Sequence, residues 1–233
     1  MNTLIVFAHP EPQSFCAAMK NAAADVLKEE GKVEISDLYA MRFKAVADES
    51  DFLKRENPDY FNYALEQRFA QKNGTLAADI QTELNKIEQA DFLLFIFPLY
   101  WYSVPAILKG YFDRVFVSGK AYGGKRIYNK GGFFGKRAML AFSLGGHSGL
   151  FGKNAIHGEI EALLKPITQG TLGYTGFEVL KPFVAYHVPY IEKPERLAIL
   201  ENFKNDLKNL NNAPIVPMPN LADFDERFNP KKI

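Results

Sequence analysis

The stretch that most constrains the fold runs from Asp91 to Phe116. It opens with an unbroken apolar run, Phe92 to Phe97, which has the length of a strand and predicts one that is buried on both faces of a parallel sheet. An amphipathic helix follows residues 98–102, with Ser103 as a candidate cap and Pro105 in its first turn. The stretch therefore predicts a strand–loop–helix unit whose loop lies at the carboxyl edge of a sheet, where open α/β sheets bind ligands.

Strand-like and helix-like patterns alternate along the rest of the chain. This alternation predicts the α/β class, with a five-stranded parallel sheet in the flavodoxin-like order 2-1-3-4-5 and helices on both faces. The other expected strands are residues 3–8, 33–38, 137–143 and 177–185, and the expected helices are residues 15–30, 59–71, 78–89, 104–115, 155–164 and 194–210.

Two segments do not fit this alternation. Residues 41–78 are polar, charged and aromatic and are long for a plain connection, so we expect an excursion that packs on the sheet edge or on a partner subunit. Residues 211–233 contain four prolines, which break any helix, and we expect an extended C-terminal tail there. The remainder, residues 1–210 with the excursion included, is expected to form one domain.

Composition excludes several classes of protein. The net charge of +1 gives no electrostatic reason to expect nucleic acid or an acidic membrane as a partner. No stretch approaches the roughly 20 apolar residues that a membrane span needs. A single cysteine, Cys16, cannot form an intramolecular disulfide or a cysteine-based metal cluster. The N-terminus lacks the basic region of a signal peptide, so we expect a first strand there and a cytoplasmic location.

Three loops are expected at the carboxyl edges of neighbouring strands. The loop His9–Phe15 lacks the glycines of a dinucleotide-binding loop, but it offers Ser14 and the free N–H groups of a helix N-terminus to a phosphate. The loop Pro98–Tyr102 supplies aromatic rings, and the glycines of Ser143–Gly149 let backbone approach a ring closely. Together the loops favour a flavin over a nicotinamide as the bound group.

Four sequence segments also resemble a known family. They are AHPEPQSFCAAMK, SDLYAM, FPLYWYSVPAILKGYFDRVF and NAIHGE, in this order along the chain. In these segments the chain resembles the flavodoxin-like NAD(P)H:quinone dehydrogenases of the DT-diaphorase type, and the resemblance covers nearly its whole length. It implies an FAD-dependent homodimer, with FMN less expected, in which NAD(P)H is the co-substrate and a quinone accepts a hydride by a ping-pong mechanism at the subunit interface.

The resemblance implies particular site residues. Around the flavin phosphates it places His9, Ser14, Phe15, Cys16 and Ala18, and at the adenosine it places Asn62 and Arg196. Along the isoalloxazine it places Pro98, Leu99, Tyr100, Trp101, Tyr102, Ser143, Leu144, Gly145, Gly146 and Phe151. The implied substrate pocket contains Trp101, Gly145, Gly146 and His157, with Tyr122 and Tyr174 supplied by the other subunit.

The implied catalytic residue is His157. In the family that this chain resembles, a tyrosine and a histidine donate a proton where negative charge develops, but Phe151 stands at the tyrosine position here. A phenyl ring cannot donate a proton, so we expect His157 to act alone or through water. Two further departures are Tyr100, where the family often has glutamine, and Gly124, where a second pocket tyrosine is expected. Metal ligands known from shorter family members are not matched, so no metal is expected.

Other functions remain open from the sequence. One is a flavin-binding regulatory subunit of a potassium-efflux system, although such proteins are shorter and the excursion at residues 41–78 argues against it. Another is a reductase of azo or nitro compounds, because a two-electron flavin site accepts many acceptors. A flavodoxin-like electron carrier fits poorly, since carriers are small and acidic and this chain is neither.

Overall fold

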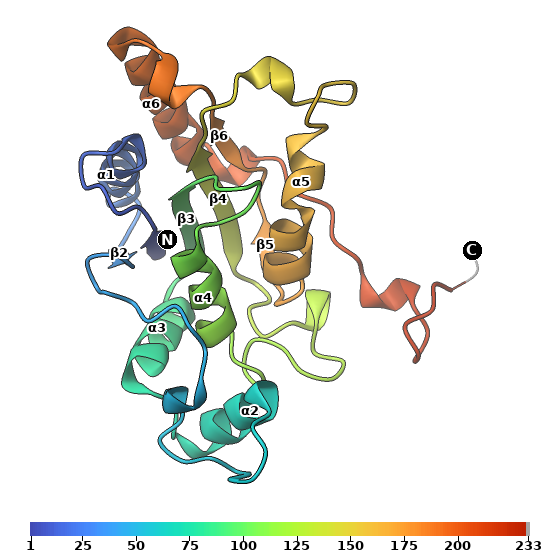
Figure 1. Ribbon diagram of the computed structural model, residues 1–233. Coiled ribbons are helices and arrows are strands. Elements are labelled where there is room, and N and C mark those ends of the chain that lie inside the picture. The colour runs from blue at the N-terminus through green and yellow to red at the C-terminus, as the bar shows by residue number, and fades with distance from the viewer. Residues whose placement is uncertain (232–233) are drawn as a thin grey trace.

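A parallel sheet forms the centre of the computed structural model, which describes residues 1–231 (Figure 1). The strands are β1 (Thr3–Phe7), β2 (Val33–Asp37), β3 (Phe92–Pro98), β4 (Arg137–Ser143), β5 (Glu178–Val179) and β6 (Phe183–Ala185). Their order is β2-β1-β3-β4-β5, with β6 also paired to β4 and every pairing parallel. The predicted class and the order 2-1-3-4-5 are confirmed, with a sixth short strand added.

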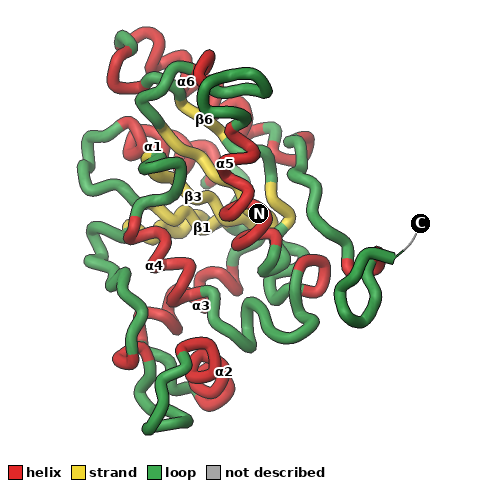
Figure 2. Tube along the Cα trace, turned by 45° about the vertical axis from the view of Figure 1, so that its right-hand side comes forward, coloured by secondary structure: helices red, strands yellow, loops and turns green. Residues whose placement is uncertain are grey.

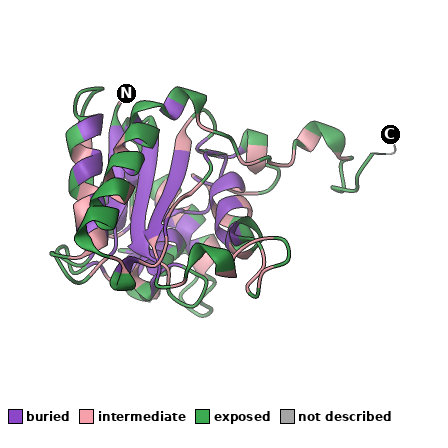
Figure 3. Ribbon diagram, turned by 90° about the horizontal axis from the view of Figure 1, so that it is seen from above, coloured by how far each residue is buried: buried purple, intermediate pink, exposed green. Residues whose placement is uncertain are grey.

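Helices cover both faces of the sheet, as Figure 3 shows by the buried strands between them. One core lies between the sheet and α3, α4 and α5, and the other between the sheet and the paired helices α1 and α6. β3 is buried over its whole length, because both cores use its side chains. The helices are α1 (Phe15–Leu27), α2 (Tyr63–Asn73), α3 (Ala78–Gln89), α4 (Ala106–Val115), α5 (Ile160–Ile167) and α6 (Lys193–Lys208).

Three local predictions are wrong. The single strand expected at 177–185 is divided into β5 and β6, because Pro182 cannot donate to the ladder and the Lys181 N–H bonds to Pro214 instead. The helix expected from residue 155 begins only at Ile160, since Gly158 adopts a left-handed φ of +73° that ends any helical run. Ser103 does not cap α4, whose N-cap position is Pro105.

The excursion is anchored by a buried ionic cluster. Arg114 of α4 is only 1% exposed, and its Nη2 donates to Asp51 Oδ1 at 2.8 Å. Lys44 Nζ donates to the same oxygen at 2.8 Å, and Tyr63 Oη donates to Asp51 Oδ2 at 2.7 Å. Arg114 Nη1 also donates to Asp79 Oδ2 at 2.7 Å. The cluster therefore joins the excursion to α3 and α4, and places α2 at one end of the molecule (Figure 1).

The tail leaves the body after a short contact with the sheet. Ile215 forms an antiparallel bridge with Leu180, and the chain then projects outward, as Figures 1 and 3 show. A single turn of helix, Leu221–Asp223, is the last element. The tail expected at 211–233 extends two residues beyond the described part, so residues 232 and 233 lie outside it. No helix within residues 1–231 is both long and apolar enough to cross a membrane.

Replacement of Asp51 by asparagine should destabilise the fold strongly. The change removes the buried carboxylate that Arg114, Lys44 and Tyr63 share and leaves the Arg114 guanidinium with Asp79, which is 41% exposed; loss of a buried partner typically costs about 3–5 kcal/mol of unfolding free energy. Asp113→Asn on α4 is the matched control, since its ion pair with Lys109 is exposed and is worth less than about 1 kcal/mol. Urea unfolding at neutral pH measures both variants, and equal stabilities would contradict the assignment of the cluster.

Acid provides a second readout of the same variant. Burial alone would raise the pKa of Asp51, but hydrogen bonds from Arg114, Lys44 and Tyr63 outweigh it and lower the pKa below its ordinary value. The stabilisation is therefore complete above the unfolded pKa of about 3.9 and is lost as the pH falls through the folded pKa. The difference in unfolding free energy between the wild type and Asp51→Asn should therefore become smaller below pH about 4.

Candidate functional site

Three loops meet at the carboxyl edge of the sheet, as predicted, because β1, β3 and β4 are parallel neighbours. The register of β3 on β4 ends with the pair Pro98 and Ser143, so both of their loops begin at the same level. Leu99 N–H donates to the Ser143 carbonyl oxygen at 2.9 Å. The Ser143 hydroxyl lies 3.1 Å from the Cys16 thiol of α1, which joins the first loop to the other two.

The N-terminus of α1 is free to receive an anion. Ser14 caps it, with its hydroxyl accepting from Ala17 N–H at 3.1 Å, and the first turn carries no acidic side chain. His9 Nδ1 accepts from Glu11 N–H at 2.9 Å, and burial lowers the pKa of His9, so its imidazole is neutral at pH 7. The backbone N–H groups of the first turn and the helix dipole then supply the attraction for a phosphate.

The other residues expected to contact the phosphates are less available, because they are buried or already hydrogen-bonded. The Cys16 thiol is buried, and burial raises its pKa, so it stays protonated and can reach a ligand only through its backbone N–H. Ala18 N–H already donates to the Ser14 carbonyl at 3.0 Å. Phe15 is half-buried at the start of α1. Ser14 and the first-turn amides are thus the most available contacts.

The aromatic loop is a tight turn with a strained backbone. Tyr100 and Ser103 exchange two backbone hydrogen bonds, of 3.0 and 2.9 Å. The two residues between them, Trp101 and Tyr102, have φ values of +50° and +57°. Two consecutive positive values define the type I′ turn, which normally carries asparagine and glycine and not bulky aromatics. The turn leaves Trp101 95% exposed, as an open platform for a planar ligand.

The glycine loop faces the same edge. Gly145 is exposed, and its carbonyl lies 3.0 Å from His187 Nδ1, so the loop is tied to the turn that precedes α6. A Cβ on Gly146 would lie 3.1 Å from the Phe151 ring, so a larger residue here would require this ring to shift by a few tenths of an ångström. Leu144 is buried below them. Backbone therefore forms the surface that a ring would meet here.

His157 lies between the aromatic loop and the glycine loop. Its Nδ1 is 2.9 Å from the Tyr102 hydroxyl, and the centroids of the two rings are 5.4 Å apart. Its backbone N–H donates to Leu150 O at 3.0 Å, and the Phe151 ring lies 5.3 Å from its imidazole. Tyr102 and His157 are 55 residues apart in the sequence. No spacing pattern predicts this pair, and sequence reasoning missed it.

Two expected adenosine contacts do not meet in one chain. Asn62 caps α2, where its Oδ1 accepts from Leu65 N–H at 3.2 Å. Arg196 is exposed on the first half of α6. Figures 1 and 2 show α2 and α6 at opposite ends of the molecule. A single chain therefore cannot bring both residues to one adenosine.

The tyrosines expected from the other subunit also lie apart from the three loops. The rings of Tyr122 and Tyr174 are 5.8 Å apart, and both line a groove of about 630 Å³. Phe61 and Tyr63, which flank Asn62, line the same groove. Burial raises the pKa of Tyr174. The two tyrosines expected from another subunit thus lie on the same surface as the residues that flank Asn62.

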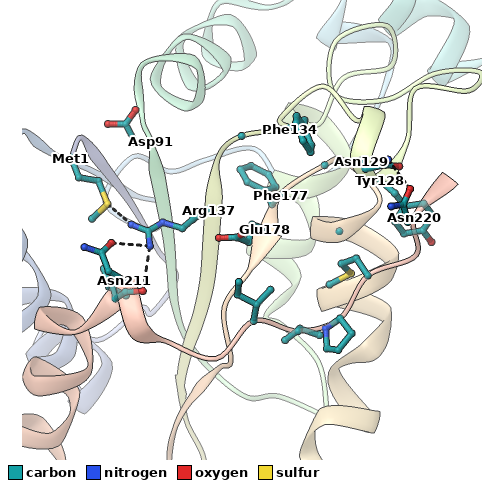
Figure 4. Close-up of a pocket in the computed structure, with 18 of the residues that line it drawn as sticks. Met1, Asp91, Tyr128, Asn129, Phe134, Arg137, Phe177, Glu178, Asn211 and Asn220 are labelled. Carbon is teal, nitrogen blue, oxygen red and sulfur yellow. Dashed lines mark hydrogen bonds between the residues drawn. The ribbon is translucent and has the colours of Figure 1, made fainter. Parts of the chain in front are cut away.

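A further cavity of about 750 Å³ lies at the opposite edge of the sheet (Figure 4). Arg137, at the start of β4, donates to the Leu210 carbonyl at 3.2 Å and to Asn211 Oδ1 at 3.3 Å. Its guanidinium also contacts Met1 Sδ at 3.2 Å. The arginine therefore joins the N-terminal residue to the turn that follows α6. Within residues 1–231 no three histidine, cysteine or acidic side chains are grouped to hold a metal ion.

The residues at the carboxyl edge fit a flavin nucleotide. A capped helix N-terminus without acidic side chains in its first turn suits its phosphate, and an exposed indole and an exposed glycine on neighbouring loops suit its ring. Fold and site together define the flavodoxin-like class of α/β proteins. The family model described as a flavodoxin-like fold matches residues 1–209.

Relatives narrow this class. NAD(P)H dehydrogenase (quinone) 1 of Cavia porcellus is 42% identical over 97% of this chain and 82% of its own length. Ribosyldihydronicotinamide dehydrogenase (quinone) of Homo sapiens is 39% identical over 89% of this chain and 90% of its own. The structure of a proposed quinone reductase from Klebsiella pneumoniae, 35% identical, superimposes with a TM-score of 0.94 and covers 99% of this chain and 94% of that chain. The chain belongs to the flavodoxin-like NAD(P)H:quinone dehydrogenase family.

Relief of the turn strain should stabilise the flavin-free protein. Trp101→Asn keeps the turn but places there a residue that tolerates positive φ, and the exposed indole loses no buried surface. We expect a gain of about 1 kcal/mol in unfolding free energy, because the left-handed conformation costs an ordinary residue about 1–2 kcal/mol. Trp101→Phe, which keeps the strain, is the control in urea unfolding. If both variants have wild-type stability, the turn stores no strain.

Proposed function

We propose that this protein is an FAD-dependent homodimer that transfers a hydride from NAD(P)H to quinones and similar acceptors by a ping-pong mechanism. One observation carries the proposal: a free helix N-terminus, a strained aromatic turn and a bare glycine loop share one edge of the sheet. The family relationship supports the same reaction. We further propose that residues 1–210 are the flavin-binding catalytic domain, that the protein acts in the cytoplasm and that residues 211–233 are its tail.

The residues of this chain would bind the cofactor in two parts. Ser14, with the α1 amides, would hold the phosphates, with His9 nearby as a neutral donor. Trp101 and the backbone of Gly145 would hold the ring between the two loops. The bound flavin would supply the two-electron chemistry.

We propose that the nicotinamide and the quinone use one binding place above the ring in turn. The surface between Trp101, Gly146 and His157 would orient first the nicotinamide and then the quinone, so the first product must leave before the acceptor enters. His157 would donate a proton where charge develops on the acceptor oxygen. This alternation is what a ping-pong mechanism requires.

A second subunit would complete the site. Asn62 caps α2 and Arg196 belongs to α6, and these two helices lie at opposite ends of the molecule (Figures 1 and 2). Tyr122 and Tyr174 line a groove that includes no residue of the three loops. In a dimer with a two-fold axis, one surface of each subunit faces the loops of the other. The tyrosine groove of one subunit would then cover the substrate on its partner, and Asn62 would reach the partner's cofactor.

Purified protein should be yellow and should release FAD on denaturation. Anaerobic NADH or NADPH should bleach the flavin absorbance, and a quinone such as menadione should restore it in a separate step. The measurement is the visible spectrum, with the extracted flavin identified by chromatography. Release of FMN would correct the cofactor alone. Absence of flavin after reconstitution with both FAD and FMN would contradict the function.

The shared site can be tested with a mixed dimer. Trp101→Ala and Tyr174→Ala homodimers should each lose most activity. Every site then lacks either the indole that holds the ring or the partner's tyrosine that covers the substrate. A hybrid purified with two different affinity tags has one site with both changes and one with neither, and it should regain about half of the wild-type rate. A hybrid as inactive as its parents would show that both side chains act within one chain.

A further inference from the structure

The side chain of Tyr102 contacts His157 from the aromatic loop. The tyrosine of the related family would instead stand at position 151, after the glycine loop. The Tyr102 hydroxyl lies 2.9 Å from His157 Nδ1, while the ring that follows the glycine loop, Phe151, carries no hydroxyl. Tyr102 is held there by the strained turn, with a φ of +57°. A strained backbone conformation at one residue is typically retained where the position of its side chain matters for function. The chemical role of this contact rests on the function proposed above.

We propose that Tyr102 is the positioning and proton-supplying partner of His157. When the Tyr102 hydroxyl donates to Nδ1, the neutral imidazole must carry its own proton on Nε2. The Nε2–H is then the group presented to a ligand. Without the hydroxyl either tautomer can form, and a fraction of the molecules has no donor at Nε2.

Quinone reduction requires a proton in addition to the hydride, and the Tyr102–His157 pair can supply it. NAD(P)H supplies a hydride, by way of the flavin, and the quinone needs one more proton to become a hydroquinone. His157 gives its Nε2 proton to the quinone oxygen while the Tyr102 proton moves to Nδ1, so the imidazole remains neutral throughout. The phenolate left on Tyr102 takes a proton from water, to which its side chain is 41% exposed.

The energetics favour a phenol as the source of this proton. A hydroquinone is itself a phenol, so the relay moves a proton between groups of similar acidity. A neutral imidazole acting alone would be left as an anion, which is far more costly. The net reaction is NAD(P)H, a quinone and one solvent proton giving NAD(P)⁺ and a hydroquinone.

The test replaces Tyr102 by phenylalanine, which removes only the hydroxyl. The quinone half-reaction should slow by about tenfold or more, since a positioned proton donor contributes roughly 10²–10⁴-fold. Reduction by NAD(P)H, which transfers a hydride alone, should keep its rate. Reoxidation by ferricyanide, which takes up electrons without protons, should also keep its rate. Tyr60→Phe makes the same chemical change on the exposed excursion, where Tyr60 is 70% exposed, and is the matched control.

Relocation of the hydroxyl supplies the rescue. The centroid of the Phe151 ring lies 5.3 Å from that of the His157 ring, so the double variant Tyr102→Phe/Phe151→Tyr again places a phenol next to the imidazole. This double variant should recover part of the lost quinone rate. In flavin-free protein, the ¹⁵N shifts of His157 should report mainly the Nε2–H tautomer in the wild type and a mixture in Tyr102→Phe.

The outcomes separate the relay from the function. A wild-type enzyme that reduces no quinone overturns the proposed function and the relay with it. An active enzyme whose Tyr102→Phe variant keeps the quinone rate overturns the relay alone. Equal losses with quinone and ferricyanide, or an unchanged tautomer, would show that Tyr102 is merely structural. Selective loss with quinone, together with the tautomer change and the rescue, supports the relay.

Discussion

The pairing of β3 with β4 is the constraint on which the rest of the site depends. The two strands are in register over their whole length, from Phe92 opposite Arg137 to Pro98 opposite Ser143. Both are buried in the sheet and satisfy each other's backbone groups, so neither can slip without exposing apolar side chains. Because the strands end level, the aromatic turn and the glycine loop begin side by side.

Stability elsewhere offsets the strain at that edge. The ionic cluster joins Arg114 of α4, the helix that follows the aromatic turn directly, to Asp51 and Lys44 of the excursion. It fixes one end of α4 against the excursion, while the turn fixes the other. The helix therefore connects a buried ionic anchor at one end to a strained turn at the other.

The sequence predicts the regular elements well where one pattern dominates. β4 and α3 begin and end at their predicted residues, because continuous apolar runs and a clean helical period leave no competing arrangement. Prediction fails where the backbone of one residue ends an element. Pro182 lacks the N–H that the last strand needs, and Gly158 has a left-handed φ just before α5. These are local conformations that periodicity does not register.

The candidate site shows the same division. Ser14 and Trp101 were predictable from their places next to strands, since the position of a loop follows from topology. The bond between Tyr102 and His157 was not, because it depends on a backbone conformation that aromatic residues rarely adopt. The separation of Asn62 from Arg196 becomes visible only when the helices are placed in space.

The unfavourable turn also has a consequence for how such chains diverge. Asparagine followed by glycine would form the same turn at lower cost, so selection for stability alone would favour those residues over Trp101 and Tyr102. Selection on a bound ring and a placed hydroxyl opposes this replacement. A duplicated copy that is released from its chemistry should lose the aromatic pair early while keeping its sheet and helices. The residues in this turn would then distinguish a working descendant from one that retains only the fold.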